Sequence, residues 1–148
     1  MIEDKDIYCK DWVLLNVDTV QSGKDSGLFT YDDKIAIEKK IHKLTGKKIG
    51  LFMHHHPIAV GIPLVDNCML MNSRALFDLI DANDHIRSLV CGHAHTYFTE
   101  IYNDCVVDVC PATCFQWKPG ARTVQTLNKR GYKVLEFSEK FHSETFYS

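Results

Sequence analysis

The stretch Gly50-Leu51-Phe52-Met53-His54-His55-His56-Pro57 decides how the chain is interpreted, together with a second one, Cys91-Gly92-His93-Ala94-His95. Each continues an apolar run typical of a buried strand and ends in histidines. Both groups of imidazoles are therefore expected at the carboxyl edge of a sheet. In α/β proteins ligands and catalytic groups gather at that edge, so the two stretches predict one shared site.

Short apolar runs alternate with amphipathic stretches, which predicts an α/β fold. Before residue 95 the order is strand, helix, strand, helix, strand, and this order favours parallel pairing. After residue 95, short runs separated by turns are typical of antiparallel strands. We therefore expect one mixed sheet with flanking helices. The expected strands are at 12–18, 48–53, 85–91, 97–102, 105–110, 133–137 and 141–146. One expected helix is capped by Thr30 with Asp33 and ended by Gly46, and a second is capped by Asn72 and runs to about Ala82.

Three histidines are the expected metal ligands. His93 and His95 alternate with Ala94, so in an extended backbone both imidazoles point to the same side. His55, arriving from the neighbouring strand edge, would complete three nitrogen ligands. Such a set suits Zn, Mn, Fe or Co.

Other polar residues are expected to face substrate or to support these ligands. They are His54, His56, Asp66, Asn72 and Thr113. The two histidines flank His55 with opposite orientation. Asp66 belongs to the irregular segment 57–72, and long loops at sheet edges are often binding loops, although a simple turn is an equally open interpretation. Asp18 ends a strand and is interpreted as a turn or capping carboxylate.

The histidine motifs and a third stretch, Pro111-Ala112-Thr113-Cys114-Phe115-Gln116, closely resemble the carboxyl-terminal half of calcineurin-like metallophosphoesterases, particularly the bacterial class III cyclic-AMP phosphodiesterases. The likeness runs from about Trp12 to the end of the chain. It implies a four-layer αββα sandwich of two sheets with flanking helices, and a centre of two metal ions, commonly Fe and Mn. Carried over by position, His55 and His93 resemble ligands of the second metal, and His95 resembles a ligand of the first.

The resemblance implies a parent enzyme that hydrolyses 3',5'-cyclic AMP to AMP with a hydroxide activated by two metals. Two alternatives stay open: a phosphohydrolase acting on another phosphodiester or a monoester, and a non-catalytic metal-binding module. The family's amino-terminal motifs, Asp-x-His, Gly-Asp and Gly-Asn-His, have no counterpart in this sequence. We therefore expect residues 1–148 to form a single partial domain that lacks a complete catalytic set, binds metal poorly and is inactive without its amino-terminal half.

Composition limits the partners. The net charge is -2 and no basic stripe is present, so no nucleic-acid partner is expected. The longest apolar runs fall far short of the roughly 20 residues that span a bilayer. The charged residues 1–5 lack an apolar secretory core, which predicts a cytoplasmic protein with reduced cysteines. Loss of half a sandwich would expose an apolar face, so we also expect a homodimer.

Overall fold

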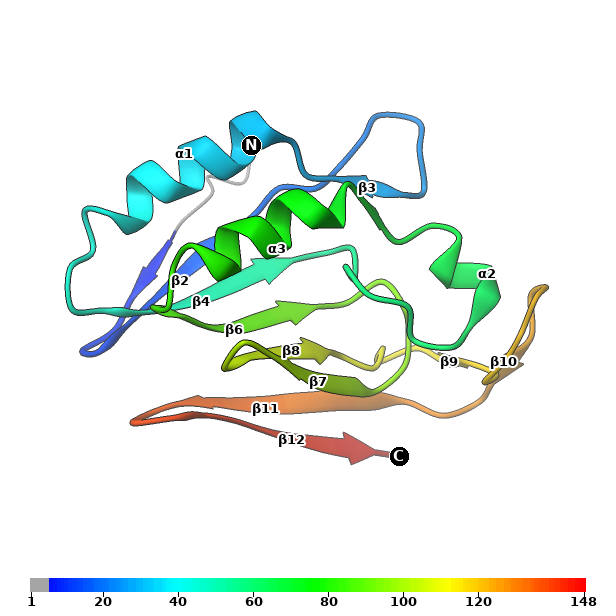
Figure 1. Cartoon of the computed structure of the whole chain (residues 1–148). Coiled ribbons are helices and arrows are strands. Elements are labelled where there is room, and N and C mark those ends of the chain that lie inside the picture. The colour runs from blue at the N-terminus through cyan, green and yellow to red at the C-terminus, as the bar shows by residue number, and fades with distance from the viewer. Residues whose placement is uncertain (1–5) are drawn as a thin grey trace.

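The computed structural model describes residues 6–148, and its centre is a six-stranded sheet with the order β1-β2-β4-β6-β8-β7 (Figure 1). The charged segment 1–5 lies outside the described residues. Neighbouring strands from β2 to β8 run parallel, and β1 and β7 pair antiparallel at the two edges. The predicted α/β class with one mixed sheet is confirmed. The strands are β1 (Ile7–Tyr8), β2 (Trp12–Asn16), β4 (Lys48–Met53), β6 (Ile86–Cys91), β7 (Phe98–Tyr102) and β8 (Cys105–Val109).

Helix α1 (Tyr31–Ile41) begins with the predicted capping box. The Asp33 N–H donates to Thr30 Oγ1 at 3.1 Å, and the Thr30 N–H donates to Asp33 Oδ2 at 2.8 Å. These two bonds satisfy amides that a helix start otherwise leaves unpaired. The helix ends at Ile41, earlier than expected, and a turn leads on to Gly46, whose φ is 75°.

Helix α3 (Ser73–Asp81) follows Asn72, but that residue does not cap it through its side chain. The Asn72 backbone is left-handed, with φ 57°, and its amide Nδ2 donates to the Phe29 carbonyl at 3.1 Å. The side chain therefore joins two loops. The predicted helix is present, but the prediction that the Asn72 side chain caps it is wrong. Both helices lie on the same side of the sheet (Figure 1).

A hairpin of β11 (Gly131–Phe137) and β12 (Phe141–Tyr147) lies on the other side of the sheet (Figure 1). The Phe137 ring meets Trp12 edge-on, with ring centroids 5.1 Å apart. A Cβ on Gly50 would lie 3.3 Å from Phe137, so the glycine lets the hairpin approach the sheet closely. The layers are thus helices, sheet and hairpin.

Two expectations about the connections are wrong. Segment 57–72 is not wholly irregular: it contains α2 (Pro63–Asp66) and β5 (Leu70–Met71), which pairs in parallel with β3 (Gly27–Leu28). Strand β8 pairs in parallel with β6 instead of joining a purely antiparallel group. The reason is burial, because β8 is almost wholly buried and takes an interior position, whereas the exposed β7 takes the edge. A short pair, β9 (Gln116–Trp117) and β10 (Thr126–Leu127), completes the fold.

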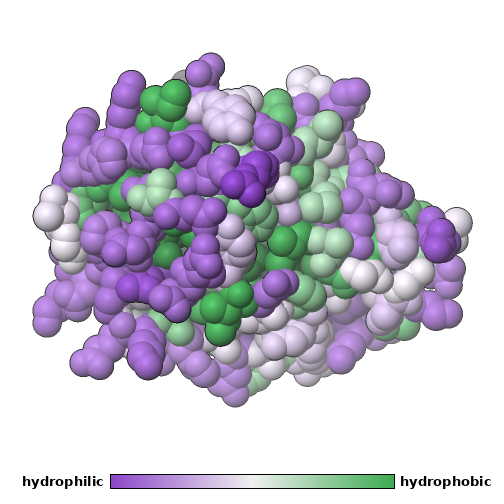
Figure 2. All heavy atoms as spheres, viewed as in Figure 1, coloured by the Kyte–Doolittle hydropathy of each residue, from purple (hydrophilic) through white to green (hydrophobic). Residues whose placement is uncertain are grey.

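Hydrophilic side chains cover most of the face shown in Figure 2. Hydrophobic side chains are exposed between them in separate places. Among residues 6–148, no helix has both the length and the apolar character needed to cross a membrane.

Candidate metal centre

The structure brings the two histidine stretches together at the carboxyl edge of the sheet. Met53, the last residue of β4, pairs with Cys91, the last residue of β6, so both chains leave the sheet at the same level. Beyond them, one ligand atom from each of His54, His55 and His93 lies within 4.8 Å of the others. The spacing is that of groups able to share one ion.

His54 belongs to this cluster, although the sequence suggested that it flanks His55 with opposite orientation. Its Nε2 lies 3.2 Å from His93 Nδ1, and its ring centroid lies 4.9 Å from that of His55. The alternation of side chains fails because β4 ends at Met53 and the backbone bends through the histidines. The strand-based expectation for His54 is therefore wrong.

The segment from Gly92 to His95 is a tight turn and not the extended backbone that was expected. His93 and His95 have φ values of 64° and 44°, and the Ala94 N–H donates to the Gly92 carbonyl at 2.6 Å. Positive φ is uncommon for residues other than glycine, and such strained positions gather at functional sites. The fully buried Ala94 holds the turn in place between the two histidines.

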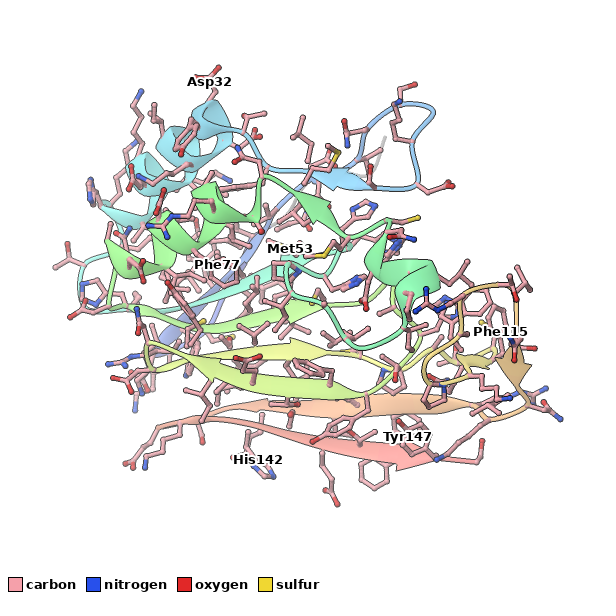
Figure 3. All side chains as sticks on the ribbon, turned by 45° about the vertical axis from the view of Figure 1, so that its right-hand side comes forward. Asp32, Met53, Phe77, Phe115, His142 and Tyr147 are labelled. Atoms are coloured by element: carbon pink, nitrogen blue, oxygen red, sulfur yellow. The ribbon has the colours of Figure 1, made fainter. Side chains whose placement is uncertain are left out.

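His95 lies next to the cluster but outside the group of three. Its Nδ1 is 3.9 Å from the Cys114 sulfur, and its ring centroid is 4.7 Å from Phe115 and 5.9 Å from Trp117. Figure 3 shows Phe115 at the right of the view, beside the β9 and β10 pair. His95 thus lies against the aromatic rings of Phe115 and Trp117.

His56 and Asp66 face each other in the loop after β4. His56 is fully buried, and its Nε2 lies 3.4 Å from Asp66 Oδ1. The same carboxylate accepts three backbone N–H groups at 2.8, 3.1 and 2.9 Å, from Val60, Gly61 and Ile62. Three such bonds fold the loop around one carboxylate, so the structure shows Asp66 ordering the turn.

The remaining candidates lie on the surface. Thr113 is exposed, and Asn72 is exposed with its amide bonded to Phe29. Asp18 Oδ1 accepts the Val20 N–H at 2.9 Å, which is the turn role expected for it.

Two residues that the sequence did not single out contact His55. Thr19 Oγ1 lies 2.7 Å from His55 Nδ1. A Cβ on Gly27 would lie 2.5 Å from the same ring, so only glycine leaves room for it. No local pattern marks either residue, because their role depends on β3 lying against the end of β4.

Comparison with known proteins identifies relatives that are similar to this chain in sequence. No protein-family model matches it. A probable cyclic nucleotide phosphodiesterase of Xenorhabdus bovienii is 36% identical over 138 residues, which cover 93% of this chain and 56% of the relative. The 3',5'-cyclic adenosine monophosphate phosphodiesterase CpdA of Pseudomonas aeruginosa is 29% identical over 138 residues, covering 91% and 50%.

The chain is a homologue of bacterial cyclic nucleotide phosphodiesterases. It spans about half the length of the curated relatives that it matches. The resemblance inferred from the histidine motifs is thereby confirmed. A probable glycerophosphodiester phosphodiesterase GpdQ of Arcobacter nitrofigilis is also similar, with 32% identity over 95 residues, 64% of this chain and 35% of the relative.

Burial favours the neutral form of two clustered histidines in this phosphodiesterase homologue, His93 and His55. It lowers the pKa of His93 to about 4, and the neighbouring His55 adds to the effect. Burial also lowers the pKa of His55, ahead of His54 and against a hydrogen bond to the Asp25 backbone. A neutral imidazole is the form that ligates metals.

The residues present fit a divalent ion. His93 Nε2 is buried and has no hydrogen-bond partner among residues 6–148. Such an atom costs free energy unless something pairs with it. The donor set consists of imidazole nitrogens, which suit Zn, Mn, Fe and Co.

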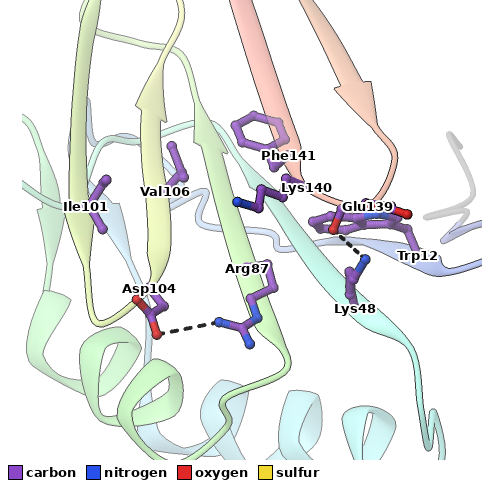
Figure 4. Close-up of a pocket in the computed structure, with 9 residues that line it drawn as sticks. All are labelled: Trp12, Lys48, Arg87, Ile101, Asp104, Val106, Glu139, Lys140 and Phe141. Atoms are coloured by element: carbon purple, nitrogen blue, oxygen red, sulfur yellow. Dashed lines mark hydrogen bonds and ion pairs between the residues drawn. The ribbon is translucent and has the colours of Figure 1, made fainter.

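A cavity of about 540 Å³ opens at the other end of the sheet, where β2, β4 and β6 begin (Figure 4). There Lys48 Nζ donates to the Glu139 carbonyl at 2.6 Å, and Arg87 pairs with Asp104 at 3.8 Å. Its lining is Trp12, Lys48, Arg87, Ile101, Asp104, Val106, Glu139, Lys140 and Phe141. It shares no residue with the histidine cluster.

Proposed function

We propose that this chain is the histidine-bearing part of a metal-dependent phosphodiesterase whose substrate is 3',5'-cyclic AMP. The observation that carries the proposal is the convergence of His54, His55 and His93 within 4.8 Å of one another in a homologue of cyclic nucleotide phosphodiesterases. Groups from two separate strand ends meet there, and burial lowers the pKa of His55 and His93, which favours the neutral form that binds metal.

The family resemblance implies that His55 and His93 would hold one ion and that His95 would serve a second ion. The geometry supports adding His54 to the first pair. Fe and Mn are the metals proposed, with Zn and Co as alternatives that the same nitrogen donors accept. A bound ion of this kind would activate water and stabilise the negative charge that develops on the phosphate. Asp66 would hold the adjoining loop in shape through its three backbone hydrogen bonds.

We further propose that residues 1–148 form one partial domain and that full activity needs the portion that this chain lacks relative to its homologues. The coverage of about half of those relatives supports this. A cytoplasmic location is proposed because all six cysteines are free. A homodimer is proposed from the hairpin, where Tyr132 and Val134 are 54% and 53% exposed.

The similarity to a glycerophosphodiester phosphodiesterase favours a second candidate, a phosphodiesterase that acts on diesters other than cyclic nucleotides. Both candidates share the same centre and differ only in substrate.

The experiment measures metal content and hydrolysis of the purified chain after exposure to Mn²⁺ or Fe²⁺. Substrates are 3',5'-cyclic AMP, a glycerophosphodiester and a phosphomonoester. We expect His55→Ala and His93→Ala to lose bound metal and any slow diester hydrolysis. His142→Ala is the matched control, because this exposed histidine lies on the outer strand of the hairpin (Figure 3).

Equal metal content in the wild-type chain and both cluster variants would reject the proposed centre. Hydrolysis of the glycerophosphodiester in preference to cyclic AMP would select the second candidate. Sedimentation of the chain as a monomer at all concentrations would reject the homodimer.

A further inference from the structure

Thr19 is the buried hydroxyl that faces the candidate centre from a third strand. It follows β2, is 2% exposed, and its carbonyl accepts the Leu28 N–H at 2.9 Å. Its Oγ1 lies 2.7 Å from His55 Nδ1. Strands β2, β4 and β6 are neighbours in the sheet, so Thr19, His55 and His93 leave three adjacent strand ends. Thr19 therefore lies at the same edge of the sheet as the histidines of the candidate metal centre.

Two residues, Thr19 and Gly27, contact the imidazole ring of His55 at its Nδ1 side. Thr19 approaches Nδ1, and Gly27 lies so close that a Cβ there would be 2.5 Å from Nδ1 and Cγ. The Nδ1 side of the ring is thus enclosed by Thr19 and β3. Nε2 is therefore the ring nitrogen of His55 that Thr19 does not approach.

A neutral imidazole carries one proton, and the nitrogen that bears it cannot ligate a metal. For Nε2 to ligate, the proton must be on Nδ1, and Nδ1–H needs an acceptor. The Asp25 backbone also hydrogen-bonds this ring. The Thr19 hydroxyl oxygen is the acceptor that lies 2.7 Å from Nδ1, and it is screened from water because Thr19 is 2% exposed and His55 is 5% exposed. Groups that accept this second ring N–H usually fix the orientation and the tautomer of metal-binding histidines.

We propose that Thr19 is a positioning residue: its hydroxyl accepts the Nδ1 proton of His55 and fixes the tautomer that offers Nε2 to a divalent ion shared with His54 and His93. This inference rests on the proposed metal centre. It assigns a role to a residue outside the two histidine motifs.

The test compares Thr19→Val, which keeps the shape and removes the hydroxyl, with Thr19→Ser, which keeps the hydroxyl. Nitrogen-15 NMR of the metal-free chain reports the His55 tautomer, and titration with Co²⁺ or Zn²⁺ reports affinity. We expect Nδ1–H in the wild-type chain and in Thr19→Ser. We expect Thr19→Val to lose this preference and to bind the ion about 10- to 100-fold more weakly.

Thr99→Val is the control, since it removes a hydroxyl bond to Asp108 instead of one to a histidine. It should leave ion affinity unchanged. Unchanged affinity in Thr19→Val, or an Nε2–H tautomer in the wild-type chain, would overturn the role of Thr19 alone. Failure of the wild-type chain to bind either ion would reject the metal centre and this role with it. Rescue by serine distinguishes positioning from a general loss of folding.

Discussion

The two faces of the six-stranded sheet are built on different principles. The helix face is closed by aliphatic side chains that are each at most 1% exposed: Val13, Leu15, Ile49, Leu51, Leu76 and Leu79. The hairpin face is closed by aromatic contacts around Phe137 and by an ion pair between Asp108 and Lys133, whose side chains are 0% and 1% exposed. Side chains alternate across a strand, so β8 directs Asp108 to the hairpin and Val107 to the helices.

This difference determines which substitutions on each face should lower the stability of the fold. An aliphatic face loses stability roughly in proportion to the volume removed. A buried ion pair behaves otherwise, because loss of one partner leaves the other charge buried and unpaired. Asp108 depends on few groups: Lys133 and Thr99 contact Oδ1, and Oδ2 has no partner within the part of the chain that the structure describes.

The largest effect is expected from Lys133→Met, which breaks the hairpin face by leaving Asp108 without its cation. The free energy of unfolding should fall by about 3–5 kcal/mol, measured by urea denaturation. The double variant Lys133→Met with Asp108→Leu removes both charges and should recover most of the loss. If the single and double variants were equally unstable, the ion pair would not explain how the hairpin is held.

A somewhat smaller effect is expected on the helix face from Leu79→Ala in α3. Leu79 is fully buried, so the variant should lose about 2–4 kcal/mol of unfolding free energy through lost burial and a residual cavity. Ile35→Ala on α1 is the control, since Ile35 is 47% exposed and should change stability by less than about 0.5 kcal/mol. Equal losses in the two variants would contradict the assignment of α3 to the core.

Much of the helix face was predictable because local patterns specify it. The apolar run 48–53 coincides with β4, and the Thr30 and Asp33 pair forms the expected capping box. Both depend on neighbours within a few residues. Alternation and capping are local physics, so tertiary contacts did not need to be known.

The histidine cluster was predictable in place but not in detail. Two strand ends carrying histidines indicated a shared site, yet His54 enters the group of three and His95 lies beside it. His93 has a left-handed backbone beside the buried Ala94, and Thr19 meets His55 across 36 residues of chain. Such features depend on packing between distant segments, which single-sequence periodicity does not encode.

The smallest effect is expected from Thr30→Ala, which tests how much of the helix face α1 provides. The variant removes the acceptor of the Asp33 N–H and should cost about 1 kcal/mol of unfolding free energy. Only Ile37 and Ile41 of α1 are buried, so we expect amide hydrogen exchange to accelerate mainly in its first turn while α3 stays protected. Thr45→Ala in the exposed turn after α1 is the control. Faster exchange throughout α3 would mean that the two helices unfold as one unit and that the capping box supports the whole face.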